Sequence, residues 1–164
     1  MVNFMNNLIY RQQIQHSDIE AIADIVESSG FFSAEEIEIA LELAEEKLTQ
    51  PHDSSYRFLF AEDEKRVVGY TCYGLIPATS ASYDIYWIAV QKDMRCHGLG
   101  RLLMAETEKI IYKSGGRQIY AETSSRDQYK PTHKFYESCG HHQEAFLKNF
   151  YHEADSKIIY VKTL

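Results

Sequence analysis

The sequence predicts a mixed α/β (α+β) fold in a single domain over residues 1–164. Segments rich in β-branched and aromatic residues alternate with segments whose apolar residues lie three and four positions apart, which indicates strands and amphipathic helices. The chain is 45% hydrophobic and 25% charged, as globular proteins are. Its 164 residues are enough to bury a core, and they contain no internal repeat.

The first part of the chain is expected to form one strand and two helices. Residues 8–14 are the first predicted strand. Ser17-x-x-Glu20 and Ser33-x-x-Glu36 have the spacing of a capping box, in which a serine and a glutamate side chain satisfy backbone N–H groups at a helix start. Each box precedes apolar residues at helical spacing, so one helix is expected after each box.

Three strands are expected to follow these helices. Residues 56–61 and 67–75 are apolar segments on either side of a polar turn, which indicates paired strands. Residues 82–90, SYDIYWIAV, are β-branched and aromatic, which is typical of a buried central strand.

Glycines follow both helices predicted in the last part of the chain. Gly115-Gly116 and Gly140 are suitable helix ends, and Pro131 suits the first turn of a short helix. The expected elements are a helix from Leu99 to Gly115, a strand over residues 117–123, a helix over 129–139, and a strand pair over 144–151 and 157–164.

The charge of the chain restricts its partners. The net charge of −7 argues against a nucleic-acid partner, which needs a basic face. The excess acid is concentrated from Glu35 to Glu46, where it forms either a solvated helix face or a surface that attracts cationic amines. No apolar run approaches the roughly 20 residues that span a bilayer, so no membrane partner is expected.

The cysteines and histidines show no metal-site spacing. Cys72, Cys96 and Cys139 are odd in number and far apart, which indicates reduced thiols in a cytoplasmic protein. The seven histidines include no H-x-x-x-H pair. We therefore expect no metal cofactor.

A glycine-containing loop between a strand and a helix is the main functional signal. In the segment RCHGLG, Gly98 and Gly100 let backbone N–H groups approach a ligand closely. The helix that starts there adds free N–H donors and a partial positive charge, which favours phosphate. The segment lacks the G-x-x-x-x-G-K-[ST] pattern of nucleoside triphosphatases, and Leu103 replaces the third glycine of the dinucleotide fingerprint.

The loop and the order of elements resemble the GNAT superfamily of acetyl-CoA-dependent N-acetyltransferases. Arg95-x-x-Gly98-x-Gly100 matches the family's [RQ]-x-x-G-x-[GA] motif between the fourth strand and the third helix. The predicted order β-α-α-β-β-β-α-β-α-β-β matches the family over essentially the whole chain. The resemblance implies a central, mixed, mostly antiparallel sheet of about seven strands, splayed between strands 4 and 5, with four helices on its faces.

The resemblance also implies that acetyl-CoA is the co-substrate. In the family, the pantetheine arm lies between the splayed strands, and the amides of the loop hold the pyrophosphate. The implied cofactor-binding residues are Ile88, Ala89, Val90, Arg95, Cys96, His97, Gly98, Leu99, Gly100, Arg101, Thr123, Thr132, Phe135 and Tyr136.

Three side chains are candidates for proton transfer. Tyr136 lies in the family's F-Y-x-x-x-G run, and its phenol, with a pKa of about 10, can protonate the leaving thiolate. Asp84, four residues before Ile88, matches the position of the general-base Glu in histone-acetylating members of the family. Glu122, near the end of the next strand, is the rival base, and a water chain without a dedicated base stays open.

Aromatic residues are candidates for the acceptor site. Phe31 and Phe32 lie in a predicted loop, where they either line a pocket or close the core. Glu153 and Asp155 in the last hairpin could bind a cationic amine. The substrate-binding candidates are Phe31, Phe32, Tyr86 and Tyr151.

Two positions depart from the family pattern. His141 follows Gly140, where members of the family usually have Phe or Tyr. Tyr129 stands where many members have an Asn that helps to hold the pantetheine, so the resemblance does not imply that contact here.

Together these features predict an N-acetyltransferase that moves an acetyl group from acetyl-CoA to the primary amine of a small molecule or amino-acid-like acceptor. The expected mechanism is direct attack in a ternary complex. Two alternatives stay open: a non-catalytic acyl-CoA-binding regulatory module, and a protein or peptide N-acetyltransferase. Family members often dimerise, so a homodimer is consistent with the resemblance.

Overall fold

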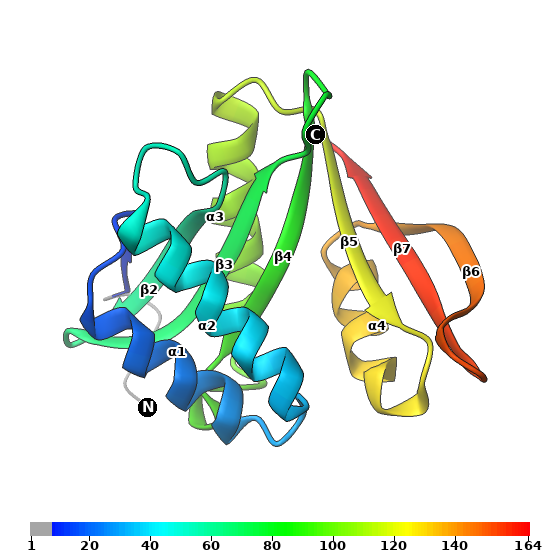
Figure 1. Cartoon of the computed structure of the whole chain (residues 1–164), viewed down its shortest axis with the longest axis horizontal. Helices are drawn as coiled ribbons and strands as arrows, with labels where there is room; N and C mark the ends of the chain where they lie inside the picture. Colours follow the sequence, from blue (N-terminus) through cyan, green and yellow to red (C-terminus); the bar gives the residue numbers. More distant parts are fainter. Residues whose placement is uncertain (1–7) are drawn as a thin grey trace. The chain divides into compact units, whose positions relative to one another are not determined.

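A computed structural model describes residues 8–164 of the chain, which hold seven strands and four α-helices. The strands follow the order β1-β2-β3-β4-β5-β7-β6 in one sheet. The chain divides into two compact units: unit 1 is Met1–Gly74 with Trp87–Met104, and unit 2 is Leu75–Tyr86 with Ala105–Leu164 (Figure 1). The prediction of a single domain over residues 1–164 stays a prediction.

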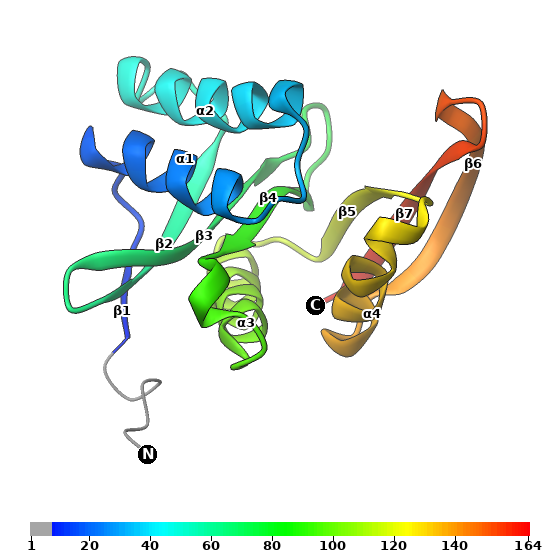
Figure 2. The same cartoon turned by 90° about the horizontal axis from the view of Figure 1, so that it is seen from below.

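Unit 1 is built from antiparallel strands with helices on both faces. Figure 2 shows α1 and α2 on one side of β2 and β3, and the start of α3 on the other. The elements are β1 (Ile9–Arg11), α1 (Ser17–Ser28), α2 (Ala34–Thr49), β2 (Arg57–Asp63), β3 (Arg66–Leu75), the end of β4 (Ser82–Val90) and the start of α3 (Leu99–Lys113). Its core includes Ile22, Ile25, Phe58, Phe60 and Tyr70, each no more than 2% exposed.

One of the two predicted capping boxes is confirmed, and the other is wrong. At α2, the Ser33 hydroxyl accepts from the Glu36 amide, and the Glu36 carboxylate accepts from the Ser33 amide. At α1, the N-cap is His16, which makes no side-chain cap bond. The Asp18 carboxylate instead accepts from the Gln15 amide and forms an ion pair with Arg11, so it takes over the start of the helix.

The start of α3 packs closely on β3 at Gly69. A Cβ at this position would lie 2.9 Å from Leu103 Cδ1 and 3.0 Å from Val90 Cγ1. Leu103 itself is fully buried. The absence of a side chain at Gly69 therefore lets the first turns of α3 lie directly on the strand.

Unit 2 contains the rest of the sheet and one helix that covers it. The elements are the start of β4, the end of α3, β5 (Gln118–Ser124), α4 (Lys130–Ser138), β6 (His142–His152) and β7 (Asp155–Thr163). β4 pairs with β5 in parallel, whereas β5 with β7 and β7 with β6 are antiparallel. The register between β4 and β5 ends at Ile85 and Ala121, although both strands continue. The splay between them stays a prediction.

The two faces of the sheet in unit 2 differ in burial. Ala121, Ile158 and Tyr160 are buried on the face that α4 covers, where the rings of Tyr136 and Tyr160 stack with centroids 5.5 Å apart. The register places a second set of residues on the opposite face, which we call the carboxylate face. The carboxylate face consists of Asp84, Tyr120, Glu122, Lys157 and Ile159.

The predicted fold class and order of elements are confirmed over residues 8–164. The central strand was predicted at residues 82–90 and lies at Ser82–Val90. The first strand is shorter than predicted, Ile9–Arg11 in place of residues 8–14. In the described part of the chain, no helix is long and apolar enough to cross a membrane.

Candidate functional site

The predicted phosphate loop joins β4 to α3 within unit 1. The Gln91 amide donates to the Val68 carbonyl at 2.8 Å, which ties the start of the loop to β3. A short 3-10 helix, Lys92–Met94, follows, and then Cys96 and Gly98 have positive φ angles of 63° and 86°. Gly98 adopts this conformation without strain, whereas a side chain at Cys96 makes it unfavourable there.

The head of α3 offers backbone donors next to positive side chains. The Leu102 amide donates to the Gly98 carbonyl in the first hydrogen bond of the helix. The amides of Leu99, Gly100 and Arg101 therefore have no acceptor within the helix itself. Leu99 is 2% exposed and anchors the helix start. Arg95 is half-buried, while Cys96, His97 and Arg101 are exposed. The loop can therefore bind an anion through backbone amides, with arginine charge added.

The end of β4 lies beside an aromatic cluster in unit 1. The rings of Phe32 and Trp87 lie 5.0 Å apart, and Phe31 makes an edge contact with Phe32 at 5.8 Å. Both phenylalanines are half-buried, so they do not close the core completely. Within residues 8–164, the buried Trp87 Nε1 has no hydrogen-bond partner. Ile88 and Val90 are also half-buried, and Ala89 is 8% exposed.

Two carboxylates and one lysine gather on the carboxylate face of unit 2. Burial and the negative charge of Glu122 raise the pKa of Asp84 to about 6, and the Lys157 ammonium opposes them. Lys157 Nζ lies 2.5 Å from Glu122 Oε2. The two candidate bases therefore differ. Glu122 forms an ion pair with Lys157, whereas the pKa of Asp84 is raised toward neutral pH.

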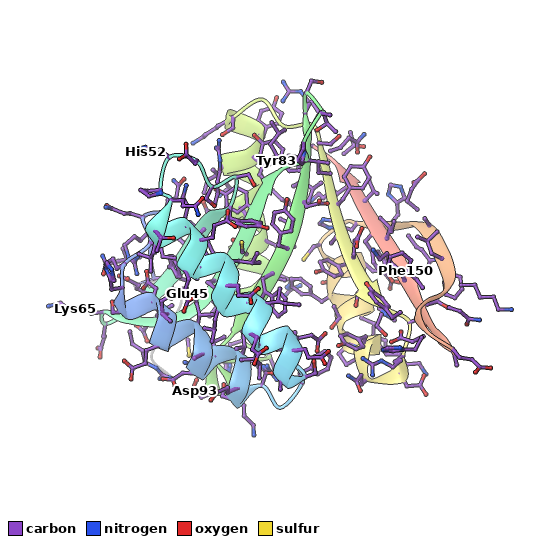
Figure 3. The ribbon with its side chains drawn as sticks, viewed as in Figure 1. Glu45, His52, Lys65, Tyr83, Asp93 and Phe150 are labelled. Carbon is purple, nitrogen blue, oxygen red and sulfur yellow. The ribbon has the colours of Figure 1, made fainter. Side chains whose placement is uncertain are left out.

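The β6–β7 hairpin surrounds the Lys157 ammonium. Lys157 Nζ lies 3.8 Å from the centre of the Phe150 ring and 5.7 Å from that of Tyr151. Phe150, labelled in Figure 3, is 52% exposed, and Tyr151 is 40% exposed. Asp155 is not available to bind an amine, because it is 5% exposed and forms an ion pair with Arg126 at 3.1 Å.

Tyr136 lies inside unit 2 among aromatic rings. It is 5% exposed, and its ring contacts those of Phe135, His141 and Tyr160 at centroid distances of 5.4, 5.7 and 5.5 Å. Burial raises the pKa of the Tyr136 phenol. The phenol therefore carries its proton at neutral pH and can act only as a donor of that proton.

The structure sorts the predicted residues into two groups. Unit 1 brings together Phe31, Phe32, Ile88, Ala89, Val90 and the loop residues 95–101. Unit 2 brings together Asp84, Tyr86, Glu122, Thr123, Thr132, Phe135, Tyr136 and Tyr151. Thr123 is 7% exposed, and Tyr86, Thr132 and Phe135 are half-buried.

Sequence analysis missed Lys157 as a site residue. Period-two alternation on the last strand puts Lys157 on one face with Ile159, but a sequence does not show which strand faces it. The pairing with Glu122 depends on the β5–β7 register, which joins Glu122 to Ile159 and Ser124 to Lys157.

Comparison with known proteins identifies the family. The sequence profile of the Acetyltransferase (GNAT) family matches residues 19–141. The chain is 43% identical to a solved protein described as a presumed GNAT-family acetyltransferase from Desulfovibrio desulfuricans, over 95% of this chain and 98% of that one, with a TM-score of 0.93. No curated protein matches the chain.

More distant structures share the fold. An aminoglycoside 6′-N-acetyltransferase complexed with coenzyme A is 18% identical, over 94% of this chain and 96% of that one, with a TM-score of 0.74. The ribosomal-protein-S18-alanine N-acetyltransferase from Escherichia coli is 16% identical, over 95% and 93%, with a TM-score of 0.71. The family profile and the 43% identical relative show that this chain belongs to the GNAT family and is an acyltransferase.

Proposed function

We propose that the protein transfers the acetyl group of acetyl-CoA to the primary amine of a small molecule or amino-acid-like acceptor. The observation that carries this proposal is the Asp84 carboxyl on the carboxylate face, half-buried and with its pKa raised to about 6. A carboxylate with this pKa accepts a proton at neutral pH and releases it readily, as an amine-deprotonating base must do.

The residues of unit 1 fit the phosphate end of coenzyme A. The amides of Leu99, Gly100 and Arg101 at the head of α3 suit the pyrophosphate, and Arg95 and Arg101 add positive charge. Backbone groups of Ile88, Ala89 and Val90 suit the amides of the pantetheine arm. Cys96 and His97 contribute through the backbone of the loop. Thr123, Thr132 and Phe135 complete the proposed cofactor-binding set.

The proposed reaction is a direct attack of the amine on the thioester carbon. Asp84 takes the ammonium proton through a water molecule, the nitrogen forms a bond to the carbonyl carbon, and the carbon–sulfur bond breaks. A backbone N–H of Ala89 or Val90 stabilises the negative charge that develops on the carbonyl oxygen. The Tyr136 phenol donates its proton to the leaving sulfur, which yields a free thiol. The nitrogen then releases its second proton through water to the Tyr136 phenolate, which yields the amide and restores the phenol.

The acceptor class follows from aromatic and acidic side chains in both units. Tyr86 and Tyr151 of unit 2 offer aromatic surface, and so, in unit 1, do Phe31 and Phe32, which suits an acceptor with apolar groups around a positively charged amine. The acidic surface of α2 adds long-range attraction for a cation. A small amine with apolar groups would contact both the aromatic and the acidic side chains. A protein or peptide acceptor is the alternative.

A panel of small amines, amino-acid amides and peptides tests this proposal. Free coenzyme A is measured as it is released from acetyl-CoA, and acetylated products are identified by mass spectrometry. We expect turnover with small amines that depends on Asp84. Tight binding of acetyl-CoA without turnover on any amine would indicate the non-catalytic binding module, and turnover confined to peptides would indicate the protein acetyltransferase.

A further inference from the structure

Asp84, Glu122 and Lys157 lie on one diagonal across three neighbouring strands of unit 2. Asp84 of β4 pairs with Tyr120 of β5, and Glu122 is the next β5 residue on that face. Lys157 of β7 pairs with Ser124, which is again the next β5 residue on that face. Each side chain therefore lies one diagonal step from its neighbour, within reach of long side chains.

Lys157 is held in place from two sides. Its side chain is 13% exposed, with Nζ 2.5 Å from Glu122 Oε2 and 3.8 Å from the centre of the Phe150 ring. A cation between a carboxylate and an aromatic face has little freedom to move. Among residues 8–164, no hydrogen bond or ion pair is formed by the Asp84 carboxylate, so the two carboxylates of this face have different surroundings.

We propose that Lys157 is a positioning residue that holds Glu122 as a paired carboxylate and so leaves Asp84 as the proton acceptor of the carboxylate face. This inference rests on the proposed role of Asp84 as the base. The Lys157 ammonium occupies the Glu122 carboxylate, whereas Asp84 forms no ion pair in the described part of the chain. The ion pair also compensates the negative charge of Glu122, which would otherwise make Asp84 harder to ionise.

The groups that face Asp84 determine its charge state. On β5 they are Tyr120 and Glu122, on β7 Lys157, and on its own strand Tyr86. Glu122 raises the pKa of Asp84 and Lys157 lowers it, so changes at these two residues should shift the titration of Asp84 in opposite directions.

The test measures the carboxyl titration of Asp84 by ¹³C NMR in the enzyme alone, and then the pH profile of kcat/KM. Lys157→Met removes the ammonium and leaves Glu122 unpaired, so the pKa of Asp84 should rise by about half a pH unit or more. Lys157→Arg keeps the charge and should restore the titration of the wild type. Lys148→Met is the matched control, because it removes an exposed lysine of the neighbouring strand. It should leave the titration unchanged.

Glu122→Gln should shift the pKa of Asp84 in the direction opposite to Lys157→Met. It keeps the inference testable if the Lys157→Met variant does not fold. It removes the negative neighbour of Asp84, so the pKa of Asp84 should fall. An Asp84 titration that is the same in Lys157→Met, or in Glu122→Gln, as in the wild type would overturn the inference. The pKa of Asp84 could shift in these variants while the acid limb of the kcat/KM profile stays in place. That result would exclude Asp84 as the base, but it would still show that the Glu122–Lys157 ion pair affects the pKa of Asp84.

Discussion

The His141 ring packs against the Tyr136 ring with centroids 5.7 Å apart, and neither His141 ring nitrogen has a hydrogen-bond partner in the described part of the chain. Burial lowers the pKa of His141 to about 4, and the charge of Lys162 acts in the same direction. A buried polar ring without partners is costly, so this histidine reduces stability while it supports Tyr136.

We therefore expect His141→Phe to stabilise the protein by about 1 kcal/mol at pH 7, because the ring contact with Tyr136 is kept and two unpartnered nitrogens are removed. The free energy of unfolding, measured by urea denaturation, checks this. His141→Ala should destabilise the protein, because it leaves a cavity next to Tyr136. Equal loss of stability in both variants would show that the nitrogens have partners.

The stability should also depend on pH through His141. Its pKa is lowered in the folded state from 6.5 to about 4, so the unfolded chain binds its proton first as the pH falls. Stability should therefore decrease between about pH 6.5 and pH 4, by on the order of 3 kcal/mol from this residue. Urea denaturation at several pH values should show this loss in the wild type and in the exposed-site control His52→Ala. A loss of the same size in His141→Phe would contradict the assignment.

Asp84→Asn should reduce kcat on an amine acceptor by roughly 100-fold to 10,000-fold, because the amide cannot take the proton. In the wild type, kcat/KM should fall as the pH drops below about 6, since the Asp84 carboxyl is then protonated and inactive as a base. Release of coenzyme A measures both. Glu122→Gln should retain most of the activity at neutral pH. A larger loss of kcat in Glu122→Gln than in Asp84→Asn would make Glu122 the base.

Tyr136→Phe should lower kcat by roughly 100-fold, because the leaving thiolate loses its proton donor while the ring packing is kept. Affinity for acetyl-CoA, measured by calorimetry, should change little. Tyr160→Phe, which makes the same change in the ring stacked on Tyr136, is the control for packing. Equal losses of kcat and affinity in Tyr136→Phe would mean that the phenol has a structural role.

Gly98→Val should abolish binding of coenzyme A, because a β-branched residue does not adopt the φ of 86° at this position. Calorimetry measures the binding, and circular dichroism shows that the fold is retained. Gly115→Val is a matched control, since Gly115 has a φ of 90° with open space around it. Unchanged binding in Gly98→Val would exclude the loop as the phosphate site.

The elements that could be predicted from sequence are those in which local signals agree. The central strand and the loop that follows it were located correctly, because a β-branched run, glycines and helical spacing meet there. Local signals failed at Ser17, where the Asp18 carboxylate and its partner Arg11 replace the expected cap. The pairing of Lys157 with Glu122 was beyond sequence analysis, because it depends on the register of strands that lie far apart in the chain.

The geometry of the proposed phosphate loop also depends on Gly69, a residue outside the loop. A methyl group added there would press on Leu103 and Val90, two side chains that flank the loop in sequence. The amides at the head of α3 would then shift as a unit. A substitution at Gly69 should therefore weaken coenzyme binding at the proposed loop, although this glycine has no side chain with which to contact the ligand.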